Sequence, residues 1–238
     1  WTDFVARWPV LAAGEALPSF RALVLENVRA NKKLLREGLP LLFEYDTAAD
    51  SIATYCHSIK PVEHVRWLDV LPELVASGHL DRDWVLTNCL LALRRDFRRP
   101  LLTWYKELFS ALQPTLAERQ ARQPELVELL AHPLPLVVNF ALEQLKELWA
   151  QVEFQPDSLL LYAENLVTRP DLKTGLKTLF AGLDKLLKNN PTQAAPVARL
   201  YAAALAHPDA GVQERAAKGL TNLLGAKKPL LDADATDR

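Results

Sequence analysis

One stretch of this chain occurs twice without gaps, and a sequence that repeats itself restricts the folds open to it. Leu130-Ala131-His132-Pro133 recurs as Leu205-Ala206-His207-Pro208, 75 residues later (205 minus 130). Matching apolar residues follow each proline at spacings of four, four and three, namely Val137, Ala141, Leu145 and Leu148, then Val212, Ala216, Leu220 and Leu223. These spacings follow one face of a helix, so the match predicts a repeated unit that ends in an amphipathic helix.

A third copy is expected halfway between these two. Arg169-Pro170 lies 37 residues after Pro133 (170 minus 133) and 38 before Pro208 (208 minus 170). A stripe of leucines at helical spacing follows it, with the phase shifted by about one residue; the stripe is Leu172, Leu176, Leu179, Leu183 and Leu186. The middle copy is therefore interpreted as a degenerate form of the same unit.

Each copy also carries signals for a first helix. Thr115 and Glu118 have the spacing of a capping box, and that helix is expected to reach Ala131. Asp157 or Ser158 is expected to cap the next first helix, and Thr192 the third. We therefore expect three helix pairs between 115 and 224, at about 115–150, 157–188 and 192–224.

The composition is that of an all-α chain. Half of the residues are hydrophobic and only 8 are Gly, while the 16 Pro fall mostly between periodic segments. Residues 1–114 are expected to be helical with an eroded repeat, and residues 225–238 to form a frayed tail. The predicted fold class is an α-solenoid, a superhelix of stacked antiparallel helix pairs.

The last unit resembles the HEAT-like repeat family. The resemblance rests on Asp209-Ala210-Gly211-Val212, followed by Ala216-Ala217 and Leu220. Gln213 stands where the family usually has an arginine, and Val138 takes the matching place in the first copy. The resemblance covers about 110 residues and implies an α-solenoid of the HEAT and armadillo type.

A second resemblance covers Asp81 to Leu148. Its residues are Arg95-Asp96-Phe97, Arg99-Pro100 and Trp104-Tyr105, followed by the run from Leu134 to Leu142. They are similar to a large bacterial family known only as a domain of unknown function, which implies no activity. Because the sequence holds no methionine, not even at position 1, we expect a piece of a longer protein or a sequence that lacks its methionines.

The densest basic cluster is the candidate binding site. Arg94, Arg95, Arg98 and Arg99 would share one broad face if they lay on a single helix, and Trp104 and Tyr105 follow closely. Guanidinium groups beside aromatic rings can bind phosphates or stack on bases. The alternative is structural, because cations in the last turn of a helix bond its free carbonyls, and Pro100 is expected to end this helix.

No metal site, cofactor or catalytic residue is expected. The metal-ligating types outside the repeats are Cys56, His57, His64, His79 and Cys89, and none has ligand spacing. His132 and His207 recur before prolines, which favours a role in the turn.

Asp81 and Asp83 beside Trp84 permit a comparison with HEAT-like DNA glycosylases, but helix caps are the simpler interpretation. No hydrolase, nucleotide-binding or metalloprotease motif occurs, so an enzyme is not favoured.

The preferred function is a non-catalytic scaffold that binds a protein or peptide partner. The alternative is a nucleic-acid-binding or DNA-repair module using the arginine cluster, which is not favoured because 28 basic residues balance 29 acidic ones. Two cysteines do not make a disulfide framework, so we expect a reducing, cytoplasmic location. The longest apolar run, Leu200 to Ala206, is far short of the about 20 residues that span a membrane, and no signal peptide is expected.

Overall fold

The computed structural model describes residues 19–46, 51–57 and 60–225, and only the backbone of those between 51 and 64. It divides into two compact units, Trp1–Val85 and Leu86–Arg238. The described chain is helical apart from one β-hairpin. This confirms the expected predominance of helices. None of the described helices combines the length and the hydropathy that a membrane span requires.

The first unit holds three helical segments, the hairpin and a fourth helix. Its elements are α2 (Phe20–Ala30), the π-helix η1 (Leu34–Gly38), α3 (Leu39–Glu44), β1 (Ser51–His57), β2 (Lys60–Arg66), α4 (Trp67–Ala76) and the first residues of α5 (Arg82–Leu93). The antiparallel hairpin β1–β2 was not predicted within 1–114, which was expected to be helical. Its strands contain Ile52, Tyr55 and Val62, residue types that favour extended backbone.

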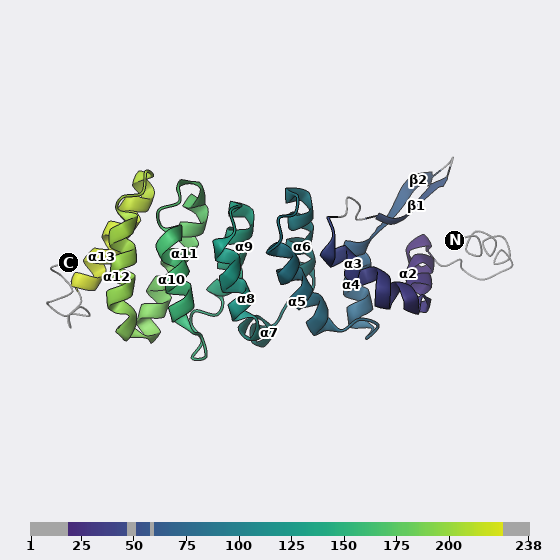
Figure 1. Cartoon of the computed structure of the whole chain (residues 1–238), viewed down its shortest axis with the longest axis horizontal. Coiled ribbons are helices and arrows are strands. Elements are labelled where there is room, and N and C mark those ends of the chain that lie inside the picture. The colour runs from purple at the N-terminus through teal and green to yellow at the C-terminus, as the bar shows by residue number, and fades with distance from the viewer. Residues whose placement is uncertain (1–18, 47–50, 58–59, 226–238) are drawn as a thin grey trace. The chain divides into compact units, whose positions relative to one another are not determined.

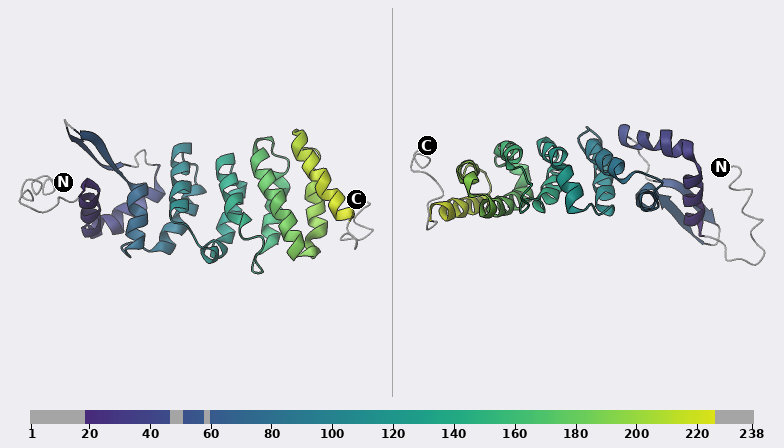
Figure 2. Two further views of the ribbon diagram at one scale, coloured as in Figure 1. Left: turned by 180° about the vertical axis from the view of Figure 1, so that it is seen from behind. Right: turned by 90° about the horizontal axis from the view of Figure 1, so that it is seen from below.

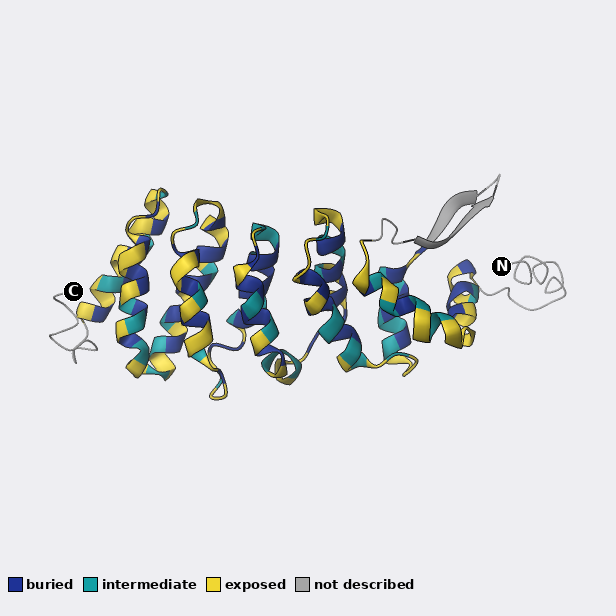
Figure 3. Cartoon of the chain, viewed as in Figure 1, coloured by how far each residue is buried: buried dark blue, intermediate teal, exposed yellow. Residues whose placement is uncertain are grey.

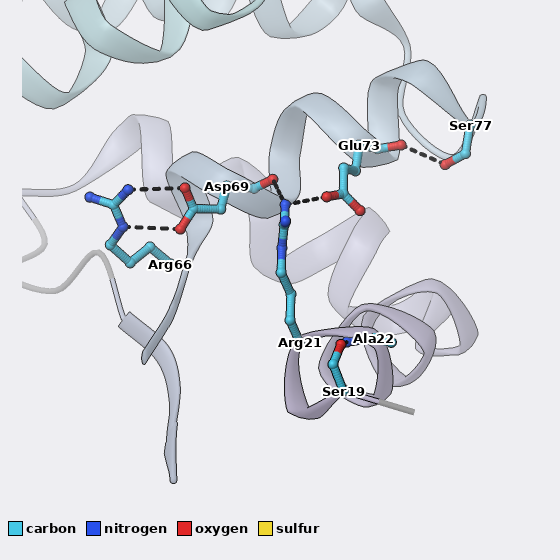
Figure 4. A network of polar contacts seen from close by, with 7 residues as sticks. All are labelled: Ser19, Arg21, Ala22, Arg66, Asp69, Glu73 and Ser77. Atoms are coloured by element: carbon cyan, nitrogen blue, oxygen red, sulfur yellow. Dashed lines mark hydrogen bonds and ion pairs between the residues drawn. The ribbon is translucent and has the colours of Figure 1, made fainter. Parts of the chain in front are cut away.

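A polar network joins these elements at the start of α4 (Figure 4). Arg66, at the end of β2, donates two hydrogen bonds to the Asp69 carboxylate, at 2.9 and 3.0 Å. Arg21 of α2 donates to the Asp69 carbonyl at 3.2 Å and pairs with Glu73. The Arg66 hydrogen bond lowers the pKa of the Asp69 carboxyl below its usual range. Two guanidinium groups thus fix α2 and β2 on α4.

The second unit is a row of helices in chain order (Figure 1). Its elements after α5 are α6 (Arg99–Ala111), α7 (Leu116–Ala121), α8 (Gln123–Glu128), η2 (Leu129–Ala131), α9 (Pro135–Lys146), α10 (Pro156–Leu166), η3 (Pro170–Leu172), α11 (Lys173–Asn189), η4 (Pro191–Gln193), α12 (Ala194–Ala204) and α13 (Ala210–Leu224). Helices α6, α9, α11 and α13 pack successively, as do α8, α10 and α12. The view from below in Figure 2 shows these two layers. We call them the second-helix layer and the first-helix layer.

The helix starts follow from local chemistry, with two corrections. Thr115 forms the expected capping box with Glu118, whose amide donates to the Thr115 hydroxyl at 3.2 Å. Asp209 caps α13 by accepting from the Val212 amide at 3.1 Å. Neither Asp157 nor Ser158 caps α10, because that helix already begins at Pro156, whose fixed φ suits a first turn. Thr192 likewise lies inside the short helix η4.

Small residues let neighbouring helices approach closely. Val137, Ala141 and Leu145 are fully buried on α9, and so is Ala216 on α13. Figure 3 shows the buried positions along these helices in dark blue. Trp149 lies against Gly182 of α11, where a Cβ atom would come within 1.6 Å of its ring. Tyr201 of α12 occupies the same kind of gap at Gly219 of α13. An aromatic ring therefore packs against a helical glycine in two places, once between the end of α9 and α11 and once between α12 and α13.

Replacing Gly182 with Ala is expected to lower the free energy of unfolding by about 1–3 kcal/mol, because the new methyl group overlaps a buried ring that has no room to move. Urea denaturation followed by circular dichroism measures the change. Lys185→Ala, on the exposed side of the same helix, is the control and should change it by less than about 0.5 kcal/mol. Equal stability of Gly182→Ala and the parent chain would show that this joint is not tightly packed.

Candidate functional site

The arginine cluster does not lie on one helix face. Helix α5 ends at Leu93, so Arg94, Arg95 and Arg98 belong to the connection that follows, and Arg99 is the first residue of α6. Pro100 therefore opens a helix instead of ending one, as proline near a helix start commonly does. The four side chains are exposed but spread along a turn, and the expected shared face is wrong for that reason.

Two of the expected site residues are already engaged within the fold. Arg94 forms an ion pair with Glu128 of α8 at 2.5 Å. Tyr105 is fully buried, stacked on Phe97 at 6.0 Å between ring centroids and edge-on to Trp104 at 5.1 Å. Its ring is thus a core contact, which corrects the expectation that it lines a binding surface. Trp104 remains half-buried.

Arg95 links the turn to this aromatic group. Its guanidinium lies 5.9 Å from the centroid of the Phe97 ring, within the range of a cation–π contact. Phe97, which contacts Arg95, was expected only as part of the motif Arg95-Asp96-Phe97, and Glu128, the partner of Arg94, was not expected. Glu128 lies 34 residues from Arg94 (128 minus 94), and no local pattern links residues at that distance.

The turn residues instead form a series of hydrogen bonds between successive helix pairs. Arg169 donates to the carbonyls of His132 and Pro133, at 2.8 and 2.7 Å. The Nε2 atom of His207 lies 3.1 Å from the Arg169 carbonyl. The backbone of Arg95 in turn hydrogen-bonds to the His132 ring. In each case a basic side chain in one turn contacts the backbone of the turn before it, and we call each such contact a rung.

The rungs have a nearly constant spacing of 37 or 38 residues. Arg95, His132 and Arg169 are 37 residues apart (132 minus 95, 169 minus 132), and His207 follows after 38. The turn between α5 and α6 thus occupies the same place as the turns before α9, α11 and α13, although its sequence lacks a proline directly after Arg95. The histidine–proline repeat indicated this position, but only the structure shows its bonding.

Both histidines are buried in their turns. The Leu134 amide donates to Nδ1 of His132 at 3.1 Å, and the Asp209 amide donates to Nδ1 of His207 at 3.0 Å. With Nδ1 accepting, the ring proton lies on Nε2, which faces the preceding turn. Burial lowers the pKa of the His132 ring, so the neutral form is favoured. The expected turn role of these histidines agrees with this geometry.

A pocket of about 320 Å³ opens beside one of these turns. It is lined by the Arg94–Glu128 pair, by His132 and Pro133, and by Tyr162 of α10. All of these residues belong to the second unit. The pocket has charged and aromatic lining residues, but the charge of Arg94 is balanced by its ion pair with Glu128.

No group of metal-ligating side chains converges among the residues the structure describes. Cys89 is fully buried and reduced, and burial raises the pKa of its thiol far above the usual range. His79 lies in the first unit, 2.9 Å from the Ser77 hydroxyl. The side chains of Cys56, His57 and His64 lie outside the described residues.

Comparison with known proteins assigns the chain to a family. Residues 23–174 match the family described as Domain of unknown function (DUF6493), and the chain belongs to it. This confirms the expected resemblance to an uncharacterised family and extends it on both sides of 81–148. No curated protein and no solved structure matches the chain.

Removal of the Arg169 rung is expected to destabilise the second unit. Arg169→Ala leaves the His132 and Pro133 carbonyls without their donors, which we expect to cost about 1–3 kcal/mol in the free energy of unfolding. Asp171→Asn is the control, because it removes the charge paired with Arg169 at 2.8 Å while leaving the donors in place. If both variants lose the same stability, the ion pair and not the rung is responsible.

Acid is expected to weaken the His132 turn. Because burial holds the folded-state pKa below the usual 6.5, the unfolded chain binds a proton that the folded chain does not as the pH falls through that value. The free energy of unfolding should therefore decrease between about pH 7.5 and about 5.5. His132→Gln, which cannot titrate, should show a smaller decrease in parallel denaturation curves. Identical pH dependence would exclude this ring as a source.

Proposed function

We propose that the chain is a HEAT-like α-solenoid that works in the cytoplasm as a scaffold for a protein or peptide partner. Support comes from the two layers of helices, from the spacing of 37 or 38 residues between the rungs, and from the aromatic rings that pack against Gly182 and Gly219. Stacked helix pairs of this kind offer extended surfaces on which partners bind. The three pairs at about 115–150, 157–188 and 192–224 form this repeat, and the turn at Arg95 adds the α5–α6 pair to it.

The observation that carries the proposal is the mainly alanine exposed face of α12, together with the exposed Leu161 on α10, whose other exposed positions are polar. Leu161 of α10 is 67% exposed, although leucine is usually buried. On the neighbouring α12, every exposed position is an alanine except one; these positions are Ala195, Arg199, Ala202 and Ala203. An apolar patch on a helix face typically marks an interaction site, and alanines let a partner backbone approach closely.

The second-helix layer exposes charged residues where α12 exposes alanines, although Leu224 of α13 is also 56% exposed. The exposed side of α11 carries Lys177, Lys185 and Lys188, and that of α13 carries Glu214 and Lys218. Charged side chains of both signs keep such a surface hydrated. We therefore place the partner on α10 and α12, with the apolar side chains as its main contacts.

Matched substitutions on the two layers test this placement. Ala202→Glu puts a charge on the apolar face of α12, and Ala217→Glu puts the same charge on the exposed side of α13. Both variants are expected to fold, since both positions are exposed. In affinity capture from extract with quantitative mass spectrometry, proteins bound by the parent chain and by Ala217→Glu should be lost with Ala202→Glu and with Leu161→Glu. Retention of every bound protein by Ala202→Glu would refute the proposed surface.

The nucleic-acid alternative rests on the exposed side chains of Arg95, Arg98 and Arg99. The Arg94–Glu128 ion pair and the burial of Tyr105 count against it, because both remove groups that the alternative requires. Nucleic acid bound there would be released by Arg99→Ala and unaffected by Ala202→Glu.

A further inference from the structure

A pocket of about 380 Å³ lies in the first unit, between the π-helical segment and the turn that joins α4 to α5. Its volume is in the range of sites that hold small molecules. Two segments line it; the first contributes Lys32, Leu35, Arg36 and Pro40, and the second His79, Leu80, Asp81 and Trp84. Single π-helical turns occur often at functional sites, so the position of the pocket beside η1 favours a role in binding.

Two cations that line this pocket have no carboxylate partner in the part of the chain that the structure describes. Lys32 and Arg36 are exposed, and neither is paired with a carboxylate among the described residues. The nearest acid in sequence, Glu37, lies 4.0 Å from Lys33, a neighbouring lysine that does not line the pocket. Like charges four residues apart on a helix repel each other, and a bound anion would relieve that repulsion.

The acid in the pocket is held by the backbone. Asp81 accepts a hydrogen bond from the Trp84 amide at 2.6 Å and so directs its carboxylate to the start of α5. The remaining titratable group in the lining is His79, whose Nδ1 contacts the Ser77 hydroxyl. Asp81 keeps its charge, but it forms no ion pair with Lys32 or Arg36, so both cations remain available to a ligand.

Trp84 supplies a flat apolar surface to the lining of the pocket. Its ring is half-buried and packs edge-on against Phe43 of α3, with centroids 5.3 Å apart at 80°. That contact fixes the orientation of the indole, while Leu35, Pro40 and Leu80 extend the apolar lining. A ligand that fills this pocket would combine a flat apolar body with an anionic group.

We propose that this pocket binds a small aromatic phosphate, with the phosphate at Lys32 and Arg36 and the ring beside Trp84. Phosphate fits two neighbouring cations better than carboxylate does, because it carries close to two charges and three acceptor oxygens. The site is separate from the scaffold surface on α10 and α12, so each proposal can fail without the other.

Phenyl phosphate is the smallest probe that carries both features. Isothermal titration of the full chain should show saturable binding in the millimolar range or tighter. Lys32→Ala and Arg36→Ala should each weaken it at least about tenfold, since each removes a charge-assisted contact. Lys33→Ala is the matched control, with the same charge change at the adjacent residue, and should change affinity less than about twofold, because Lys33 does not line the pocket.

Three further probes separate the parts of the ligand. Inorganic phosphate lacks the ring, benzyl alcohol lacks the charge, and benzoate exchanges phosphate for carboxylate; each should bind more weakly than phenyl phosphate. Trp84→Leu should reduce the affinity for phenyl phosphate to that for inorganic phosphate, with circular dichroism reporting whether the variant folds. The Lys32 and Lys33 comparison does not depend on that variant. Absence of saturable phenyl phosphate binding, equal loss in Lys32→Ala and Lys33→Ala, or tighter binding of benzoate would overturn the proposal.

Discussion

The contact on which the second unit depends is the hydrogen bond between one turn and the next. A helix pair buries one side against its neighbour, and the hydrophobic effect that drives this burial has no direction. The rungs from His132, Arg169 and His207 supply that direction at the ends of the helices. Since the accepting groups are backbone carbonyls, the contact does not depend on which side chain occupies the preceding turn.

Along the helices, the register is fixed by shape. The ring of Trp149 fits where Gly182 has no side chain, and the ring of Tyr201 fits at Gly219. Tyr201 also donates to the Asp184 carboxylate at 2.7 Å, and Asp184 pairs with Arg215. Polar and steric contacts thus meet at the same joint, so the register between α11, α12 and α13 is specified more than once.

The sequence carried most of the information on helices 115–224, because leucine and alanine periodicity and the histidine–proline turns are local signals. Pro100 misled the prediction, since proline is compatible with both the residue after a helix and the first turn of the next. Glu128, which neutralises Arg94, could not be predicted because the pairing depends on how two turns meet in space. The hairpin was missed because two seven-residue strands are short beside the helical background. The pocket beside Trp84 was missed because its two walls come from segments far apart in the chain.

The series of rungs also has a polarity. In every rung the basic side chain of one turn hydrogen-bonds to a backbone carbonyl of the turn before it. In the last described turn the His207 carbonyl accepts instead from Gln213 of the same helix pair, at 2.7 Å. Gln213 stands where HEAT-like repeats usually have arginine. A further helix pair that bound through the same kind of contact would have to donate to the His207 carbonyl. It would therefore have to displace the Gln213 amide that already donates to this carbonyl.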